Sequence, residues 1–348
     1  MQERSTATLD RFRRLPKVEL HRHLEGSLRL NTMLDIAQRH NIAIPEDVFG
    51  LSNLVQMQED ENFSFRNFLA KFDTLRLFYR SPEVIDRITR EAVDDAAKDN
   101  IRYLELRFTP VALSRAERFP LNEVMDWVIA AAQTAAVETG IVVRLIPSVN
   151  RHESPELAEQ VVWLAAERQA SGVVAVDLAG NEAEFPAAPF FGILREARQA
   201  GLRLSVHAGE WGPAANVREA IESMNADRIA HGVRVLEDPS VVALARERHV
   251  PFEVCVTSNY QSGVVSQAGS HPFPKMLESG LNVTVNTDDP SISRITLSHE
   301  YHVVSGDLGV PADVLRDRIL AAAEAAFLPD AERGDLVKGL KNDLPRDL

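Results

Sequence analysis

Short apolar runs rich in β-branched residues recur along the chain and alternate with segments of helical periodicity. Most of these runs are almost continuously hydrophobic, which is typical of parallel strands that are buried on both faces. Eight such alternations favour an α/β fold of the (β/α)8 type, the TIM barrel, over a doubly wound sheet. The expected strands are Lys17–Leu20, which runs on into a His-Arg-His sequence, Ile101–Phe108, Ile141–Val149, Val173–Gly180, Leu202–His207, Arg228–His231, Val250–Val256 and Leu281–Thr287.

The segments between these runs carry the usual signals for the beginning and end of a helix. Ser154 precedes Pro155 at the start of one helical pattern, where a hydroxyl can cap the helix and proline fits the first turn. Two other patterns end on Gly140 and Gly201, as expected for glycine at a helix C-terminus. These signals predict helices between successive strands.

The stretch from about residue 24 to residue 100 is too long for one crossover helix, so we expect several helices inserted after the first strand. This insertion explains why the chain, at 348 residues, exceeds the roughly 250 residues of a typical barrel. No repeat, low-complexity tract or flexible linker divides the sequence. We therefore predict one barrel domain over residues 1–348.

Charge and composition exclude some classes of partner. The chain has 38 basic and 51 acidic residues, a net charge of −13, which argues against sequence-independent nucleic-acid binding and against docking on anionic membranes. The single cysteine, Cys255, permits no intramolecular disulfide and no zinc site built from cysteine pairs. The sequence shows no signal-peptide pattern and no apolar run long enough for a membrane span, so a cytoplasmic location is expected. No sequence feature specifies an oligomeric state.

Residues that could carry chemistry stand at the C-terminal ends of the expected strands. In a TIM barrel these ends meet at one face, which is where the active site lies. We therefore expect the side chains to converge. They are His21 and His23 at the end of the first strand, His207 at the end of the fifth, His231 at the end of the sixth, and Asp288 with Asp289 directly after the eighth.

Four of these residues form a candidate metal site. The spacing of two between His21 and His23 puts both imidazoles on the same side of a strand. With His207 and Asp288 they would give three imidazoles and one carboxylate, a set that suits Zn²⁺ and leaves a position for water. Fe²⁺ or Co²⁺ would fit the same donors. The alternative is that these four polar residues are unrelated to one another. Their placement at matching strand ends makes this the weaker interpretation.

Neighbouring residues are candidates for acid–base work. Glu210 follows His207 by three residues, and a carboxyl group beside a metal site can serve as a general acid. His231 is a candidate base, or an electrostatic partner for a water activated by the metal. Asp289 could contact substrate, although Asp-Asp-Pro can also be ordinary turn chemistry.

The remaining histidines and aromatic residues have less specific interpretations. His40, His152 and His249 are expected at the surface, while His271, His299 and His302 are expected to be structural, and Cys255 to be a small core residue within a strand. The helical spacing of Phe65, Phe68, Phe72 and Leu75 fits either a core face or an apolar lid over a planar ligand.

Eight motifs occur in order from about Pro16 to Pro329: KVELHRHLEGSLR, FLAKFD, YLELRFTP, DLAGNE, SVHAGE, RIAHGV, CVTSN and NTDDP. As a set they are highly specific. The chain resembles the adenosine deaminase family, a branch of the metal-dependent amidohydrolase barrels. The resemblance covers nearly the whole chain.

The resemblance implies a site for deamination of a purine. Glu210 would donate a proton to the purine N1, and His231 would act on the attacking hydroxide. Asp289 would contact N7, and the backbone N–H of Gly180 would contact N3. The implied metal is one Zn²⁺ per chain, held by His21, His23, His207 and Asp288.

Further residues are implied to face the substrate. Phe68 and Phe72 match the aromatic helix that caps the pocket in the family, and His23 is implied to contact the substrate as well as the metal. Residue 25 is Glu, where adenosine deaminases usually carry Asp to bind the ribose 5′-hydroxyl; the related adenine and aminodeoxyfutalosine deaminases tend toward Glu25. The CVTSN motif also lacks the proline that is common after the cysteine.

FLAKFD and LRFTP are more similar to adenosine deaminases, so the prediction is hydrolytic deamination of adenosine and 2′-deoxyadenosine to inosine and 2′-deoxyinosine with release of ammonia. The alternatives are a 5′-modified adenosine such as aminodeoxyfutalosine, adenine itself, or a non-catalytic purine-binding barrel. A two-metal amidohydrolase would use a modified lysine on the fourth strand, and VVAVDLAG contains none.

Overall fold

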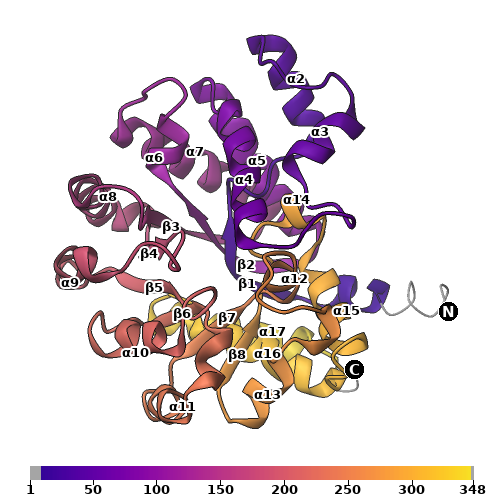
Figure 1. Ribbon diagram of the computed structural model, residues 1–348, viewed down its shortest axis with the longest axis vertical. Coiled ribbons are helices and arrows are strands. Elements are labelled where there is room, and N and C mark those ends of the chain that lie inside the picture. The colour runs from indigo at the N-terminus through magenta and orange to yellow at the C-terminus, as the bar shows by residue number, and fades with distance from the viewer. Residues whose placement is uncertain (1–8, 346–348) are drawn as a thin grey trace.

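A ring of parallel strands forms the centre of the computed structural model, which describes residues 9–345 (Figure 1). Within those residues the sheet has eight strands, and each pairs in parallel with the next one along the chain. The predicted (β/α)8 barrel is therefore confirmed. The strands are β1 Lys17–His23, β2 Ile101–Phe108, β3 Val142–Asn150, β4 Ala175–Ala179, β5 Arg203–Ala208, β6 Arg228–His231, β7 Pro251–Val254 and β8 Asn282–Val285.

The seam between the last strand and the first is closed by residues that follow β8. The backbone N–H of Asp288 donates to the carbonyl oxygen of His21 at 2.8 Å. In return, the N–H of His23 donates to the carbonyl oxygen of Asp288, also at 2.8 Å. Asp288 thus forms a parallel bridge with Arg22 and ties the end of the barrel to its beginning.

Some strand ends differ from the prediction. β1 runs through His23, three residues beyond the apolar run, so the two histidines end the strand, as predicted. β4 stops before Gly180, whose φ of +91° leaves the extended conformation. Cys255, predicted within a strand, lies one residue past β7, because a helix begins at Val256; the thiol is nevertheless buried.

Helices fill the long segment after β1, as expected. Of these, α5 packs against β2 and α7 and therefore acts as the crossover helix, whereas α2, α3 and α4 are additional. In Figure 1, α2 and α3 lie at the periphery of the molecule. Their bounds are α2 Leu30–His40, α3 Val48–Val55, α4 Phe65–Leu75 and α5 Pro82–Lys98, with the 3-10 turn η1 Arg76–Phe78 after α4.

The other helices alternate with the strands or follow them. They are α6 Pro110–Ser114, α7 Leu121–Thr139, α8 Pro155–Glu167, α9 Phe191–Gln199, α10 Ala214–Glu222, α11 Pro239–Glu247, α12 Val256–Gln261, α13 Phe273–Glu278, α14 Pro290–Ser293, α15 Leu297–Gly306, α16 Ala312–Ala325 and α17 Asp330–Asp343. Short 3-10 turns occur at η2 Gln169–Ser171, η3 Ala188–Phe190, η4 Val233–Glu237 and η5 Ala268–Ser270. Within residues 9–345, none of the helices has the length and apolar character of a membrane span.

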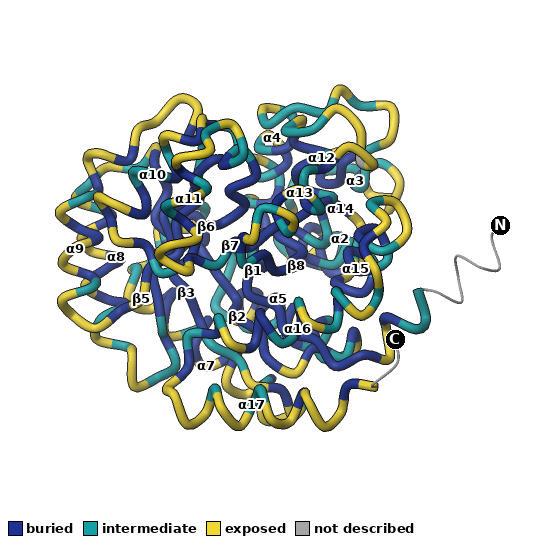
Figure 2. Tube along the Cα trace, turned by 90° about the horizontal axis from the view of Figure 1, so that it is seen from below, coloured by how far each residue is buried: buried dark blue, intermediate teal, exposed yellow. Residues whose placement is uncertain are grey.

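The predicted capping residues lie at the helix ends. The hydroxyl of Ser154 accepts a hydrogen bond from the N–H of Leu157, and Pro155 is the first residue of α8. Helix α7 ends at Gly140, which takes the left-handed conformation with φ +73°. These local signals place the helices so that their apolar faces pack on the strands, which Figure 2 shows as a buried centre under exposed outer helix faces.

Charged side chains fill part of the barrel interior. Arg228, at the start of β6, pairs with Glu105 of β2 and, at 2.5 Å, with Glu253 of β7. Arg107 also donates to Glu253, at 2.7 Å. All four are fully buried. Burial alone would raise the pKa of Glu253, but the guanidinium groups of Arg107 and Arg228 hold this pKa well below its usual value. The cluster joins three strands through charge-assisted hydrogen bonds.

Replacing Arg228 with leucine should lower the free energy of unfolding by about 3–5 kcal/mol, because Glu105 would stay buried without its cation and Glu253 would keep only Arg107. Urea unfolding of the metal-free proteins measures the difference. Arg203→Leu is the matched control: Arg203 is 57% exposed in its ion pair with Asp227, and losing it should cost at most about 1 kcal/mol. Equal losses in the two variants would contradict a supporting role for the buried cluster.

Candidate active site

Four of the predicted residues meet at the C-terminal end of the barrel. The ligand atoms of His21, His23, His207 and Asp288 all lie within 4.8 Å of one another. Nε2 of His21 is 3.3 Å from Nε2 of His23, and Oδ1 of Asp288 is 3.2 Å from both. His23 is partly buried and the other three are buried. The structure therefore brings together the donor set that the sequence suggested.

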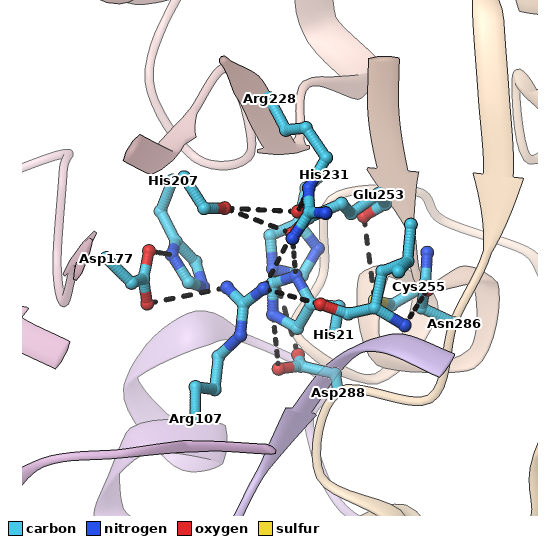
Figure 3. A network of polar contacts seen from close by, with 12 residues as sticks. His21, Arg107, Asp177, His207, Arg228, His231, Glu253, Cys255, Asn286 and Asp288 are labelled. Carbon is cyan, nitrogen blue, oxygen red and sulfur yellow. Dashed lines mark hydrogen bonds and ion pairs between the residues drawn. The ribbon is translucent and has the colours of Figure 1, made fainter. Parts of the chain in front are cut away.

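The outer nitrogens of two of these imidazoles face carboxylates. Nδ1 of His21 lies 2.9 Å from Oε2 of Glu253, and Nδ1 of His207 lies 2.9 Å from Oδ1 of Asp177 (Figure 3). A carboxylate acceptor requires the proton on Nδ1, so each neutral ring presents the Nε2 lone pair to the centre of the cluster. Lone pairs and a carboxylate oxygen this close repel one another unless a cation lies between them. The residues fit a divalent metal such as Zn²⁺.

Another group of possible ligands overlaps the first. His21, His231, Cys255 and Asp288 also place their ligand atoms within 4.8 Å of one another. Burial, followed by the charge of Asp288, raises the pKa of the Cys255 thiol well above its usual value. A protonated thiol is a poor metal ligand. The chemistry therefore favours the set with His23 and His207.

The carboxylates that support the metal cluster were not found by sequence reasoning. Asp177 and Glu253 each orient one histidine, and the hydroxyl of Ser258 donates to Oδ2 of Asp288 at 2.6 Å. A signal for Glu253 was present, because a carboxylate inside the apolar run PFEV needs a partner when it is buried. Asp177 stands in the same position within the run of β4.

Backbone conformation also shapes this face of the barrel. His231 has a φ of +58° and Asp288 a φ of +67°, both in the left-handed region that most side chains avoid. Such conformations cost about 1–3 kcal/mol each and are commonly found at functional sites. Gly26 makes room for a neighbour, since a Cβ there would lie 1.8 Å from Oδ1 of Asp289.

Glu210 is buried on a loop that another carboxylate holds in place. Glu182 accepts hydrogen bonds from the N–H groups of Gly209, Glu210 and Trp211 at 3.0, 2.6 and 2.7 Å. Burial, together with the charges of Asp288 and Glu182, raises the pKa of Glu210 well above its usual value. This shift favours the protonated form of the side chain, which suits it to act as an acid.

His231 and Asp289 complete the inner wall. Nε2 of His231 lies 3.6 Å from Oε2 of Glu210 and 3.8 Å from Oδ2 of Asp288. Asp289 is buried, and within residues 9–345 its Oδ1 has no hydrogen-bond partner. Burial and the charge of Asp288 raise the pKa of Asp289 well above its usual value, so it can donate a hydrogen bond.

A cavity of about 510 Å³ opens over these groups, a size suited to a small ligand. His152, expected at the surface, also lines it and is partly exposed. His21 lies beneath the lining. The predicted site residues that line the cavity are His23, Glu25, Phe68, Phe72, Gly180, His207, Glu210, His231, Asp288 and Asp289.

Helix α4 forms one side of the cavity mouth. Phe68 is buried and Phe72 is partly buried against the core, so the aromatic stripe both packs on the core and faces the cavity. Across the mouth, Phe65 stacks on Trp211 with ring centroids 5.5 Å apart. Arg66 of α4 pairs with Glu184 at 2.9 Å.

Glu25 and Arg76 lie at the part of the cavity away from these bridges. Oε1 of Glu25 accepts a hydrogen bond from the N–H of Thr109 at 2.6 Å. In the described part of the chain, its Oε2 and the Nε of Arg76 are buried without a hydrogen-bond partner. Arg76 forms a loose ion pair with the exposed Asp73, with Nη1 3.7 Å from Oδ1. Sequence reasoning missed Arg76, which follows Phe72 by one helical turn.

Comparisons with known proteins agree with this architecture. A family model described as adenosine deaminase matches residues 16–343. The chain is 34% identical over 326 residues to the adenosine deaminase of Klebsiella pneumoniae, covering 93% of this chain and 97% of that protein. It is 35% identical over 335 residues to the adenosine deaminase of Clostridium botulinum, and the match covers 96% of this chain and 99% of that protein.

Solved structures give the same picture. An amidohydrolase from Burkholderia ambifaria with bound Zn has a TM-score of 0.87 at 28% identity, with 95% of this chain and 91% of that chain covered. An adenine deaminase from Arthrobacter aurescens has a TM-score of 0.87 at 27% identity, with 94% and 98% covered. The N6-mAMP deaminase of Arabidopsis has a TM-score of 0.85 at 27% identity, with 96% of this chain and 99% of that chain covered. The chain belongs to the adenosine deaminase family.

Proposed function

We propose that this aminohydrolase deaminates adenosine and 2′-deoxyadenosine to inosine and 2′-deoxyinosine, with release of ammonia. The observation that carries the proposal is the buried His/His/His/Asp cluster with the buried carboxyl group of Glu210 in the same cavity, where burial raises its pKa well above the usual value. Relatives named adenosine deaminase, at about 35% identity over nearly the whole chain, support adenosine as the substrate.

We assign one Zn²⁺ to His21, His23, His207 and Asp288. Bound there, it would lower the pKa of a water molecule toward neutrality and so supply the nucleophile. Glu253 and Asp177 keep the Nε2 atoms of His21 and His207 free to bind it.

The protein's own groups then act on the purine. Glu210 donates a proton to N1, which makes C6 more electrophilic. Water adds its hydroxyl group at C6, and its other proton returns to the Glu210 carboxylate. The proton of the new C6 hydroxyl then passes to the amino group, so the C6–N bond breaks and ammonia leaves a 6-oxopurine that keeps its proton on N1. Asp289, protonated, donates a hydrogen bond to N7, and the N–H of Gly180 donates to N3. Phe68 and Phe72 cover the ring and exclude water, while His23 and Glu25 face the ribose.

Replacing Glu210 with glutamine should lower kcat by about 10²–10⁴-fold, because the amide cannot give up a proton to N1. Metal content should stay at the level of the unmodified protein, since Glu210 is not a ligand in this assignment. The matched control is Glu184→Gln at the cavity mouth, which should retain most activity. Turnover of the Glu210 variant close to that of the unmodified enzyme would contradict its assignment as the acid.

Elemental analysis should find one metal ion per chain, and removal by a chelator should abolish deamination until Zn²⁺ is restored. His207→Ala should lose the metal, whereas Cys255→Ser should keep it, because the thiol is protonated and outside the assigned set. Two ions per chain, or loss of metal in the Cys255 variant, would contradict the assigned ligands.

A second candidate is an adenosine extended at its 5′ carbon by an anionic group. The observation that favours it is Arg76, a cation on the cavity wall with a loose partner, which an uncharged nucleoside would leave unused. Glu25 also favours this candidate, since its side chain is longer than that of the aspartate usual at this position in adenosine deaminases. A phosphate directly on the 5′ carbon would face the carboxylate of Glu25, so the anion would have to lie farther out.

A spectrophotometric panel of adenosine, 2′-deoxyadenosine, aminodeoxyfutalosine, AMP and adenine should give the highest kcat/KM for the two nucleosides. Glu25→Asp should change the ranking among substrates that differ at the 5′ position, because it shortens the side chain by about one C–C bond. A higher kcat/KM for aminodeoxyfutalosine that Arg76→Leu removes would select the second candidate. A strong preference for adenine would refute both, and no deamination of any compound by the zinc-loaded protein would indicate a binding barrel.

A further inference from the structure

His231 differs from His21 and His207 in the partner of its outer nitrogen. Nδ1 of His231 lies 3.1 Å from Nδ2 of Asn259, on α12, and not beside a carboxylate. Oδ1 of the same amide lies 3.2 Å from Nε2 of His271. Nδ1 of His271, in turn, accepts a hydrogen bond from the backbone N–H of Phe273 at 3.1 Å. All four residues are buried.

The backbone N–H of Phe273 fixes the direction of every hydrogen bond in this series. A peptide N–H can only donate, so Nδ1 of His271 is an acceptor and a neutral ring carries its proton on Nε2. That proton needs an acceptor, which is Oδ1 of Asn259. The amide nitrogen of Asn259 then faces His231 and donates to its Nδ1, so that the proton of neutral His231 lies on Nε2.

Both imidazoles are neutral in this setting. His231 and His271 are almost completely buried. Burial lowers the pKa of His271 to about 3. A second proton on His231 would place an Nδ1–H against the amide hydrogens of Asn259, so the geometry requires a neutral ring there as well. The opposite orientation of Asn259 would place its amide hydrogens against the N–H of His271, leaving two buried donors face to face.

We propose that Asn259 and His271 are positioning residues that hold His231 as the Nε2–H tautomer, so that His231 donates a hydrogen bond to the attacking oxygen and does not take up its proton. The inference rests on the proposed function and decides between the two roles that the sequence left open for His231. His21 and His207 have the opposite tautomer, because their Nδ1 atoms face carboxylates. A carboxylate beside Nδ1 thus suits His21 and His207 to bind a metal, whereas the amide beside Nδ1 of His231 suits that ring to donate a hydrogen bond.

The first test reads the tautomer directly in the unmodified protein. Long-range ¹H–¹⁵N spectra of the zinc-loaded, ¹⁵N-histidine-labelled protein distinguish a protonated Nε2 from a protonated Nδ1, and loss of one set of signals in His231→Gln assigns them. We expect His231 and His271 to be protonated on Nε2. A proton on Nδ1 of His231 would overturn the proposal, whether or not the protein deaminates adenosine.

The second test reverses the tautomer with a substitution of nearly equal shape. In Asn259→Asp the carboxylate can accept from His271 and also from Nδ1–H of His231, which would leave a bare lone pair on Nε2. We expect the His231 signals to change to the Nδ1–H pattern, zinc content to stay at the unmodified level, and kcat to fall by about 10²–10⁴-fold.

Gln261→Glu is the matched control for the added charge. Gln261 is on the same helix, it is buried, and its Oε1 has no hydrogen-bond partner within residues 9–345. This variant should keep both the tautomer of His231 and kcat within a few-fold of the unmodified enzyme. Reversal of the tautomer in Asn259→Asp with kcat unchanged would overturn the proposed role of the Nε2 proton. Deamination by the unmodified enzyme tests the proposed function separately.

Discussion

The backbone hydrogen bonds of Asp288 with His21 and His23 are the constraint on which the rest of the site depends. They close the barrel between its last and first strands, and they use the same residues whose side chains form the candidate metal cluster. Closure of the sheet therefore sets the distances among these donors before any loop contributes. A site built on strands in this way is more rigid than one carried by loops.

The polar interior of the barrel is continuous with this cluster. Oε1 of Glu253 accepts from Arg228, and Oε2 accepts from both Arg107 and Nδ1 of His21, so the carboxylate that stabilises the core also orients a ligand. Asp177 repeats the arrangement for His207. The partner of each outer nitrogen decides what the inner nitrogen offers, a lone pair or a proton.

Much of the fold and the inner site follows from the sequence, because hydrophobic runs give the strands and barrel topology brings their C-terminal ends together. The partners of these residues do not follow. Glu253 meets His21 across the barrel, and Asn259 meets His231 from a helix after the next strand, so no spacing rule links them. The placement of Arg76 at the cavity depends on where the added helix α4 docks, which periodicity alone does not specify.

The contact between Gly26 and Asp289 joins two loops that are far apart in sequence. The carboxyl group of Asp289 occupies the space that a side chain at position 26 would need, with 1.8 Å between Oδ1 and the position of a Cβ. The loops after β1 and β8 are therefore not independent units. Any redesign that enlarges residue 26 would push the Asp289 side chain away from its place on the cavity wall. Changes of specificity in this scaffold would therefore have to treat the two loops as one element.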